Sequence, residues 1–268
     1  MTRSLVRLFV ASALALCLAP VAFAQDDDDS VLKPAEPDFA LVNLPTALRL
    51  PVFKSSFRIT HRFQGPLGRS SLSDLFGIDE GAQIGLEYRF GVIKNGQIGF
   101  NRVSNKTIDL FANYGVLRQG KKSPVEVSAL FSIEGTNNFK DSYSPSVGAV
   151  VSRRIGEYAA LYVEPMWVNN TNFLPKQVVD HNDTVIVGVG GRFRVRPTVY
   201  FVVEVTPRTG GYKPGTNQAS AAIEKRAGGH LFQLNVSNGA GTLPAALALG
   251  ASSNKNWYLG FNISRKFY

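Results

Sequence analysis

Apolar and polar residues alternate along most of the chain, a pattern typical of strands whose two faces meet different surroundings. In the segment AQIGLEYRFGV (82–92), Leu86 and Tyr88 fall on one face, while Glu87 and Arg89 fall on the other. The same period of two predicts about twelve strands, at 52–64, 82–92, 97–104, 107–118, 125–135, 146–154, 158–168, 184–195, 198–207, 219–226, 230–237 and 256–268. The predicted fold class is therefore all-β.

The lengths of the strands and of their connections narrow this class further. Many predicted strands approach the roughly nine to eleven residues that cross a bilayer when tilted. Connections after even-numbered strands are short and most of those after odd-numbered strands are long, with residues 104–106 as the exception. This alternation is typical of a closed antiparallel transmembrane β-barrel with short periplasmic turns and long outer loops. A soluble exported β-sandwich is the competing fold, because alternation by itself occurs in both.

Charged side chains recur on the polar face, which would face the lumen of such a barrel. The candidate lumen-lining residues are Glu87, Arg89, Glu126, Glu134, Arg154, Glu164, Arg192, Glu204, Glu224 and Arg226. These charges either pair into a plug that stiffens a closed barrel or line a narrow aqueous path. We expect a narrow channel for passive passage of small polar solutes. The alternative is a non-conducting structural or scaffold barrel that docks a periplasmic partner.

The two ends of the chain carry different signals. Arg3 and Arg7 precede a short apolar run and a small-residue cleavage pattern, so residues 1–24 are predicted to be a signal peptide that contains the single cysteine, Cys17. Residues 25–51 are predicted to form an acidic periplasmic segment, and residues 52–268 the barrel. The expected location is the outer membrane.

The final segment, NWYLGFNISRKFY (256–268), keeps its alternation to the end of the sequence. It resembles the C-terminal signal by which the barrel insertion machinery recognises outer-membrane proteins. The residues that carry this resemblance are Leu259, Phe261, Ile263, Phe267 and Tyr268. Arg265 departs from the pattern, because it occupies one of the apolar positions.

Net charge is +9, which raises the question of an anionic partner. An exported chain without a clustered stripe of basic residues argues against nucleic acid. Outer-membrane lipid and lipopolysaccharide are the expected counter-charge.

A longer resemblance covers the chain from about Phe39 onward. The segments IGLEYRFGVIKNGQIGFNRVSNKTIDLFANYGVLRQ (84–119), YVEPMWVNNTNF (162–173) and AAIEKRAGGHLFQLNVSN (221–238) resemble a bacterial family of uncharacterised β-barrels, a domain of unknown function. The resemblance implies an outer-membrane barrel of a Gram-negative bacterium and implies no activity.

Catalytic and metal-binding patterns are weak. His61, His181 and His230 each stand alone in the sequence, and VDHND (179–183) resembles an ordinary polar loop more than a cation site. Ser104 and Ser237 precede asparagines as in outer-membrane lipid hydrolases, but neither has a general base two positions before it. We therefore expect no enzyme, no catalytic residues, no metal and no cofactor.

Overall fold

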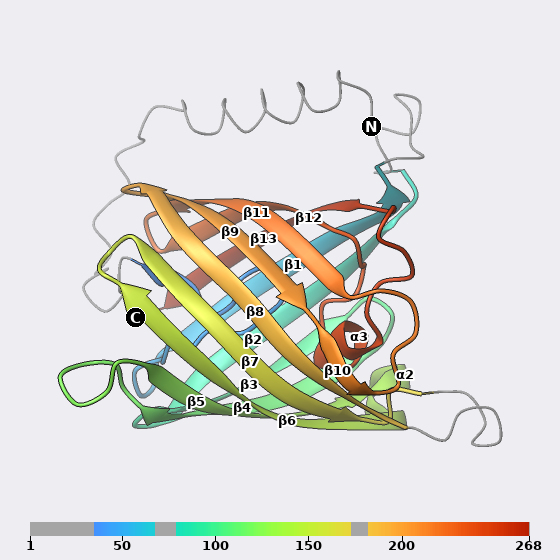
Figure 1. Ribbon diagram of the computed structural model, residues 1–268, viewed down its shortest axis with the longest axis horizontal. Helices are drawn as coiled ribbons and strands as arrows, with labels where there is room; N and C mark the ends of the chain where they lie inside the picture. The colour runs from blue at the N-terminus through green and yellow to red at the C-terminus, as the bar shows by residue number, and fades with distance from the viewer. Residues whose placement is uncertain (1–34, 68–78, 173–181, 268) are drawn as a thin grey trace.

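The computed structural model describes residues 35–67, 79–172 and 182–267. Within these ranges the chain forms a closed antiparallel barrel of twelve strands with one short extra strand, β10 (Figure 1). The strands are β1 (Ser55–Pro66), β2 (Ala82–Ile93), β3 (Gly96–Val103), β4 (Ile108–Leu117), β5 (Glu126–Gly135), β6 (Asp141–Ile155), β7 (Ala159–Asn169), β8 (Asp183–Arg196), β9 (Val199–Thr206), β10 (Arg208–Gly211), β11 (Gln218–Ala227), β12 (His230–Ser237) and β13 (Tyr258–Phe267). Two short helices, α2 (Thr136–Phe139) and α3 (Pro244–Leu249), lie in connections.

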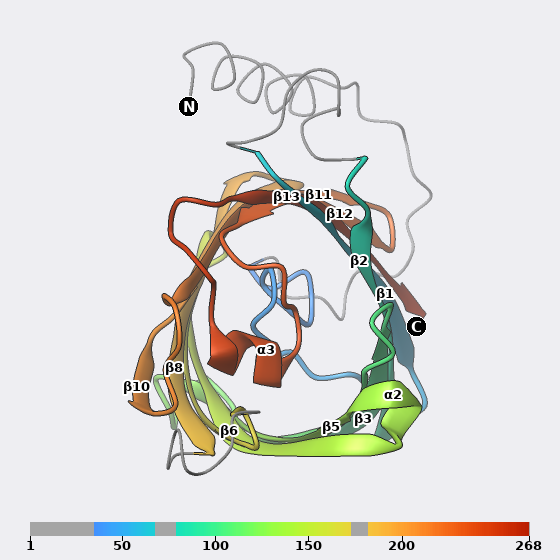
Figure 2. The same cartoon turned by 90° about the vertical axis from the view of Figure 1, so that its right-hand side faces the viewer.

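The barrel closes because the last strand pairs with the first. Ser55 of β1 lies opposite Phe267 of β13, and the ladder continues to Arg62 opposite Gly260. The remaining neighbours pair in sequence order, except that β9 bridges β8 and β11. The view into the barrel shows an unbroken wall (Figure 2).

Proline explains the extra strand. Pro207 separates β9 from β10, since it has no backbone N–H to continue the ladder. Its carbonyl still accepts the backbone N–H of Val187, and Arg208 lies opposite Ile186. β10 therefore continues the line of β9 along β8.

Residue types on the two faces of the wall are those of a membrane protein. Exposed outward side chains are apolar, such as Phe131 (52%) and Leu86 (44%), while inward side chains are largely polar and buried. This distribution suits lipid outside and a filled polar interior, and it excludes the β-sandwich. None of the helices in the described ranges has the length and apolar character needed to cross a membrane.

The predicted strands agree with the observed ones to within a few residues, with two differences at strand starts. The first strand begins at Ser55 rather than at residue 52, because Phe53 has a positive φ of 64° in a turn. β6 begins five residues early, at Asp141 rather than 146, where it pairs back onto the end of β5.

The largest difference concerns the segment before the barrel. We expected residues 25–51 to form an acidic periplasmic segment separate from the barrel, but residues 35–50 lie inside the barrel as a largely buried hairpin. Leu41 and Leu44, both fully buried, flank its turn, where the Leu41 N–H donates to the Leu44 carbonyl. The apolar residues of this segment, such as Leu41 and Leu44, explain the burial. Residues 25–34 and the predicted signal peptide lie outside the described residues.

Candidate functional site

The backbone N–H groups at the tip of the hairpin donate to one carboxylate from the wall. Glu204 of β9 accepts the backbone N–H groups of Val42 (3.0 Å), Asn43 (3.0 Å) and Leu44 (3.1 Å). The side-chain amide of Asn43 donates to the same carboxylate at 2.6 Å. Successive backbone N–H groups form a concave anion site, so the turn binds Glu204 as it would bind an anionic ligand.

Glycines in β8 let the hairpin approach the wall closely. A Cβ on Gly190 would lie 2.4 Å from Cδ1 of Leu41, and one on Gly188 would lie 2.9 Å from both Cδ atoms of Leu44. Glu164 lies beside Gly188 and is 1% exposed. Neither of its carboxylate oxygens has a hydrogen-bond partner within the described ranges.

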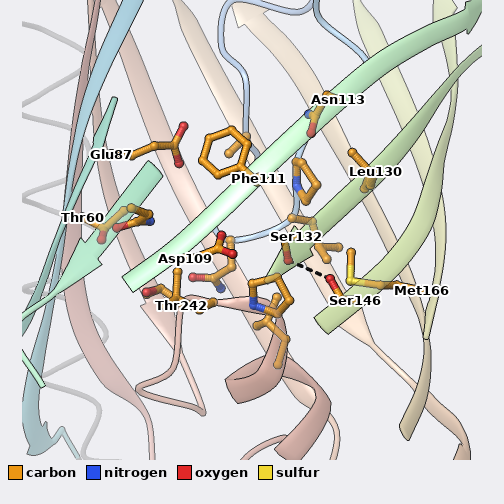
Figure 3. A pocket seen from close by; sticks show the side chains of 18 of the residues that line it. Thr60, Glu87, Asp109, Phe111, Asn113, Leu130, Ser132, Ser146, Met166 and Thr242 are labelled. Carbon is orange, nitrogen blue, oxygen red and sulfur yellow. Dashed lines mark hydrogen bonds between the residues drawn. The ribbon is translucent and has the colours of Figure 1, made fainter. Parts of the chain in front are cut away.

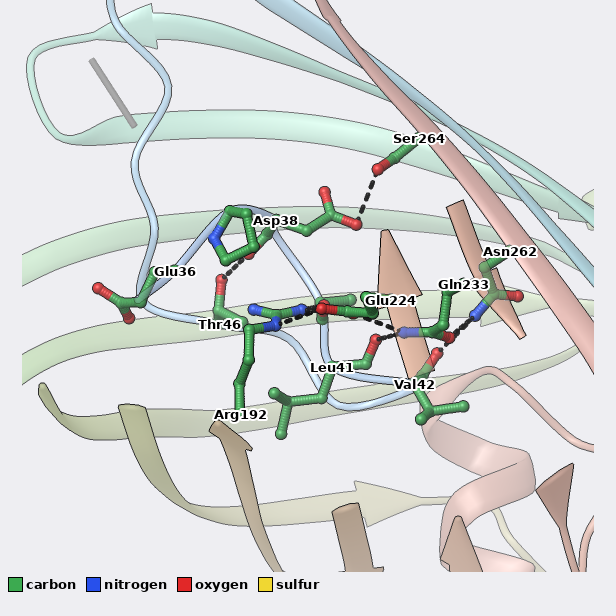
Figure 4. A network of polar contacts seen from close by, with 12 residues as sticks. Glu36, Asp38, Leu41, Val42, Thr46, Arg192, Glu224, Gln233, Asn262 and Ser264 are labelled. Carbon is green, nitrogen blue, oxygen red and sulfur yellow. Dashed lines mark hydrogen bonds and ion pairs between the residues drawn. The ribbon is translucent and has the colours of Figure 1, made fainter. Parts of the chain in front are cut away.

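A buried polar network on β8, β11 and β12 also anchors the backbone of the hairpin (Figure 4). Arg192 forms an ion pair with Glu224 at 2.8 Å and donates to the Ala40 carbonyl at 2.6 Å. Gln233 donates to Glu224 and to the Leu41 carbonyl. Arg192 and Glu224 are both 0% exposed. A buried ion pair gains from further hydrogen bonds to its remaining polar groups, and the Ala40 carbonyl of the hairpin supplies one acceptor to Arg192.

The base of the hairpin is fixed by charge. Arg154 contacts Glu36 at 2.8 Å and Glu126 at 2.6 Å. Asp38 accepts the hydroxyl of Ser264 at 2.9 Å. Burial alone would raise the pKa of the Asp38 carboxyl, but nearby cations, Lys266 foremost, hold its pKa below the ordinary value. Arg154 lies beside the short turn between β6 and β7. The base of the hairpin therefore lies at the end of the barrel that carries the short turns.

The opposite end is closed by the α3 loop, residues 238–257 (Figure 2). Ala245 donates its backbone N–H to Glu134 at 2.5 Å, and Arg208 donates to the Leu249 carbonyl at 2.6 Å. Leu247 and Ala248 join the same apolar cluster as Leu41 and Leu44. Two segments that are not part of the wall thus meet inside the lumen.

A cavity of about 80 Å³ remains between the hairpin tip, the α3 loop and the wall (Figure 3). Its polar side is formed by Thr60, Glu87, Asn101 and Asp109, from β1 to β4. Its apolar side includes Phe111, Leu130, Met166, Leu243 and Leu247. Figure 3 shows Thr60, Glu87 and Asp109 on one side of this space and Leu130 and Met166 on the other.

Comparison with known protein families gives one match. The family model DUF5777, described as a membrane bound beta barrel domain, covers residues 38–267. The chain belongs to the DUF5777 family. The predicted resemblance to a barrel family of unknown function is thereby confirmed. A comparison with curated proteins found no match.

Solved structures similar to this DUF5777 chain are membrane channels. A mutant of the Rh. blastica porin is 11% identical with a TM-score of 0.35, covering 69% of this chain and 55% of that one. A second mutant of this porin is 10% identical with a TM-score of 0.37, covering 76% and 62%. An outer membrane channel from Pseudomonas putida F1 is 11% identical with a TM-score of 0.49, covering 81% and 97%. The chain thus spans about half the length of the porin structures it matches.

The structure places the predicted lumen-lining residues as follows. Those with buried side chains are Arg89, Glu126, Glu134, Glu164, Arg192, Glu204 and Glu224. Glu87, Arg154 and Arg226 are partly exposed. Most of them contact the hairpin or the α3 loop, which sequence reasoning did not anticipate.

Sequence reasoning also missed several residues of the site. Asp109, Thr60 and Asn101 lie on the inward face of their strands, but the predicted lumen-lining residues did not include them. For Asp109 the signal was present, since it shares parity with Asn113 and Gly115 in IDLFANYGVL (108–117). The apolar residues of the hairpin were a second overlooked signal.

The predicted insertion-signal residues lie on the outer face of β13. Leu259, Phe261 and Ile263 are partly exposed and Phe267 is 44% exposed. Arg265 lies on the same face, where its guanidinium stacks on Phe267 at 5.4 Å. Tyr268 lies outside the described residues.

The weaker sequence motifs have structural roles in the described ranges. Ser237 is fully buried and accepts the hydroxyl of Ser220 at 3.0 Å, and Ser104 accepts the backbone N–H of Ile84. No group of three or more metal-ligating side chains occurs in the described parts of the chain. Asp180 and His181 of the VDHND segment lie outside them.

Proposed function

We propose that this DUF5777 barrel resides in the outer membrane and forms a channel for small polar solutes, whose closed state is the one described above. The observation that carries the proposal is the nature of the obstruction. The hairpin and the α3 loop fill the lumen, whereas side chains of the β1 to β4 wall leave a polar cavity beside them. Displacement of a non-strand segment would extend this cavity without breaking the wall.

The hairpin is the more suitable gate of the two segments. The three backbone N–H groups at its tip all donate to one carboxylate, Glu204, and at Gly188 and Gly190 the wall presents no side chain to Leu44 and Leu41. Both limbs leave through the same end of the barrel, so the hairpin can withdraw without being threaded through the lumen.

A second candidate function, a permanently closed structural or scaffold barrel, is favoured by the Arg192–Glu224 pair. In this fully buried pair Arg192 donates to the Ala40 carbonyl of the hairpin, and removing either partner of such a pair costs about 3–5 kcal/mol. A hairpin held this firmly would serve stability, or would dock a periplasmic protein at its base.

Single-channel recording in planar bilayers separates the two functions. Wild-type barrels are expected to show rare conductance steps, and Glu204→Gln barrels more frequent ones. A matched control is Glu157→Gln, which removes a 68% exposed carboxylate that pairs with Arg194 outside the lumen.

A reversible disulfide between the hairpin and the wall tests whether the hairpin is the segment that closes the channel. Leu41→Cys with Gly190→Cys places two thiols at the contact where a Cβ at position 190 would lie 2.4 Å from Cδ1 of Leu41, and a disulfide needs Cβ atoms about 3.5–4.5 Å apart. The only natural cysteine, Cys17, lies in the predicted signal peptide. Oxidation should abolish the steps and reduction should restore them. Absence of steps from every variant would leave the closed barrel as the function, and steps that survive oxidation would show that the path avoids the hairpin.

A further inference from the structure

We propose that the luminal cavity is a binding site for a small organic cation that carries a primary ammonium group and a short apolar chain. The inference deepens the proposed function by naming the solute class, and it rests on that function for access to the cavity.

The polar side of the cavity has unsatisfied hydrogen-bond acceptors. Oγ1 of Thr60, Oδ1 of Asn101 and Oδ1 of Asp109 have no hydrogen-bond partner in the described part of the chain. The three residues are only 6%, 6% and 4% exposed. Buried polar atoms of this kind are nearly always hydrogen-bonded in folded proteins. A ligand that donates hydrogen bonds would satisfy all three.

The acceptors converge because of the strand register and a glycine. Glu87 of β2 lies opposite Asn101 of β3, which lies opposite Asp109 of β4. Gly85 has no side chain, and a Cβ there would lie 2.5 Å from Oγ1 of Thr60 and 3.1 Å from Oδ1 of Asn101. The missing side chain therefore lets these two oxygens lie close to each other beside the backbone of β2.

The charge of the site favours a cation. Arg89 forms an ion pair with Glu87, with 2.9 Å between Nη2 and Oε1. Its guanidinium carbon also lies 4.7 Å from the centre of the Phe111 ring. Arg58 donates to the carbonyls of the hairpin at Leu41 and Val42. Asp109 has no cation at ion-pair distance among the described residues, and it lies opposite a second carboxylate, Glu134, in the register of β4 and β5. An ammonium group would offset this excess of negative charge.

The residues that line the cavity favour an amine over a metal ion. A metal would need several carboxylate or histidine ligands, and no suitable group of three occurs in the described ranges. A primary ammonium carries three donors, which equals the number of unsatisfied acceptors. The apolar side, with Leu130, Met166 and Leu247, would contact an alkyl chain.

Calorimetric titration of the purified, detergent-solubilised barrel with n-butylammonium tests the site. The compounds for comparison are n-butanol, which keeps the chain but has no charge, tetramethylammonium, which has charge but no N–H donor, and Mg²⁺. Butylammonium is expected to bind at least tenfold more tightly than any of the three. Equal binding of tetramethylammonium or tighter binding of Mg²⁺ would overturn the assignment of a primary ammonium.

Two variants locate the binding. Asp109→Asn removes the charge, and Gly85→Ala places a methyl group 2.5 Å from Oγ1 of Thr60, which displaces this acceptor without changing charge. Each is expected to weaken butylammonium binding by about tenfold or more, the equivalent of one lost charge-assisted hydrogen bond. Glu157→Gln, with the same loss of one negative charge, should bind like wild type. Retained heat-modifiability on gels shows that each variant is folded, and unchanged affinity in folded Gly85→Ala would refute the site.

Titration of Glu204→Gln separates this inference from the proposed function. Binding in the absence of any conductance would refute the channel but leave the cation site intact. Conductance steps without butylammonium binding would do the reverse. Failure of both wild type and Glu204→Gln to bind would overturn the cation site, since release of the hairpin tip removes the barrier to entry.

Discussion

Glu204 acts at the level of a single residue, because one carboxylate satisfies three consecutive amides of the hairpin turn. Glutamine keeps one acceptor oxygen but loses the charge, and hydrogen bonds to charged groups contribute about 1.5–3 kcal/mol each. We expect Glu204→Gln to lower the free energy of local opening of the hairpin tip by about 2 kcal/mol. This change corresponds to roughly 30-fold faster hydrogen exchange of the tip amides. Mass-spectrometric exchange of peptides that contain residues 42–44 measures this. The same peptides should be unaffected by Glu157→Gln, and equal protection in both variants would contradict the role of Glu204.

Gly190 is the complementary residue on the wall. A methyl group there would overlap Leu41, and overpacking of a well-filled interior costs about 1–3 kcal/mol. Gly190→Ala is therefore expected to destabilise the barrel by that amount in denaturant unfolding monitored by tryptophan fluorescence.

Truncation of Leu41 provides the matched test of this contact. Leu41→Ala combined with Gly190→Ala should cost less than the sum of the two single changes, by about 0.5–3 kcal/mol for residues in contact. Strict additivity would show that the overlap relaxes elsewhere.

At the level of elements, β13 has two roles that its sequence predicted only in part. Its outer face carries the residues that resemble an insertion signal, and its backbone closes the barrel against β1, with Phe267 opposite Ser55. Deletion of residues 267–268 should lower the heat-modifiable, membrane-inserted fraction more than it lowers any activity of barrels that do insert. Tyr258→Ala, at the other end of the strand, is the control. Equal assembly of the two variants would argue against a special role for the last residues.

The strands could be predicted from the sequence because the alternation of apolar and polar residues is a local pattern. Alternation located the strands because a residue on a strand meets lipid or lumen according to its parity, which requires no knowledge of distant residues. The hairpin could not be found in this way. Its partners, such as Asn262 for Val42 and Ser264 for Asp38, lie more than 200 positions away in the sequence. Its turn becomes stable only against a wall that is itself assembled.

In the candidate site, too, the sequence predicted which side chains face inward but not which contacts they make. Parity predicted that Glu87 and Glu204 face inward, but the two residues do different things. Glu204 binds the amides of the hairpin, while Glu87 pairs with Arg89 beside the cavity. The difference depends on which part of the lumen the hairpin occupies, and no sequence pattern records that.

For the whole molecule, orientation of the wall is the property that most needs a direct test. Leu86 is 44% exposed on the outer face, and Glu87 borders the luminal cavity. Single cysteines at these adjacent positions should therefore react differently in membranes, with Leu86→Cys labelled by a lipid-soluble maleimide and Glu87→Cys protected. Reversed reactivity would invert the assignment of lipid and lumen. Labelling of Leu117→Cys, which is 48% exposed on β4, is a positive control.

The hairpin is covalently joined to β1 through residues 51–54, and this link has a kinetic consequence. A short linker holds a displaced segment at an effective concentration of about millimolar near its site. Redocking is then intramolecular, so the closed fraction does not depend on how dilute the protein is. A free peptide with the sequence of residues 35–50 would have to be added at about millimolar concentration to compete. Even in Glu204→Gln, the open state should thus be brief, because the tethered hairpin rebinds inside the lumen.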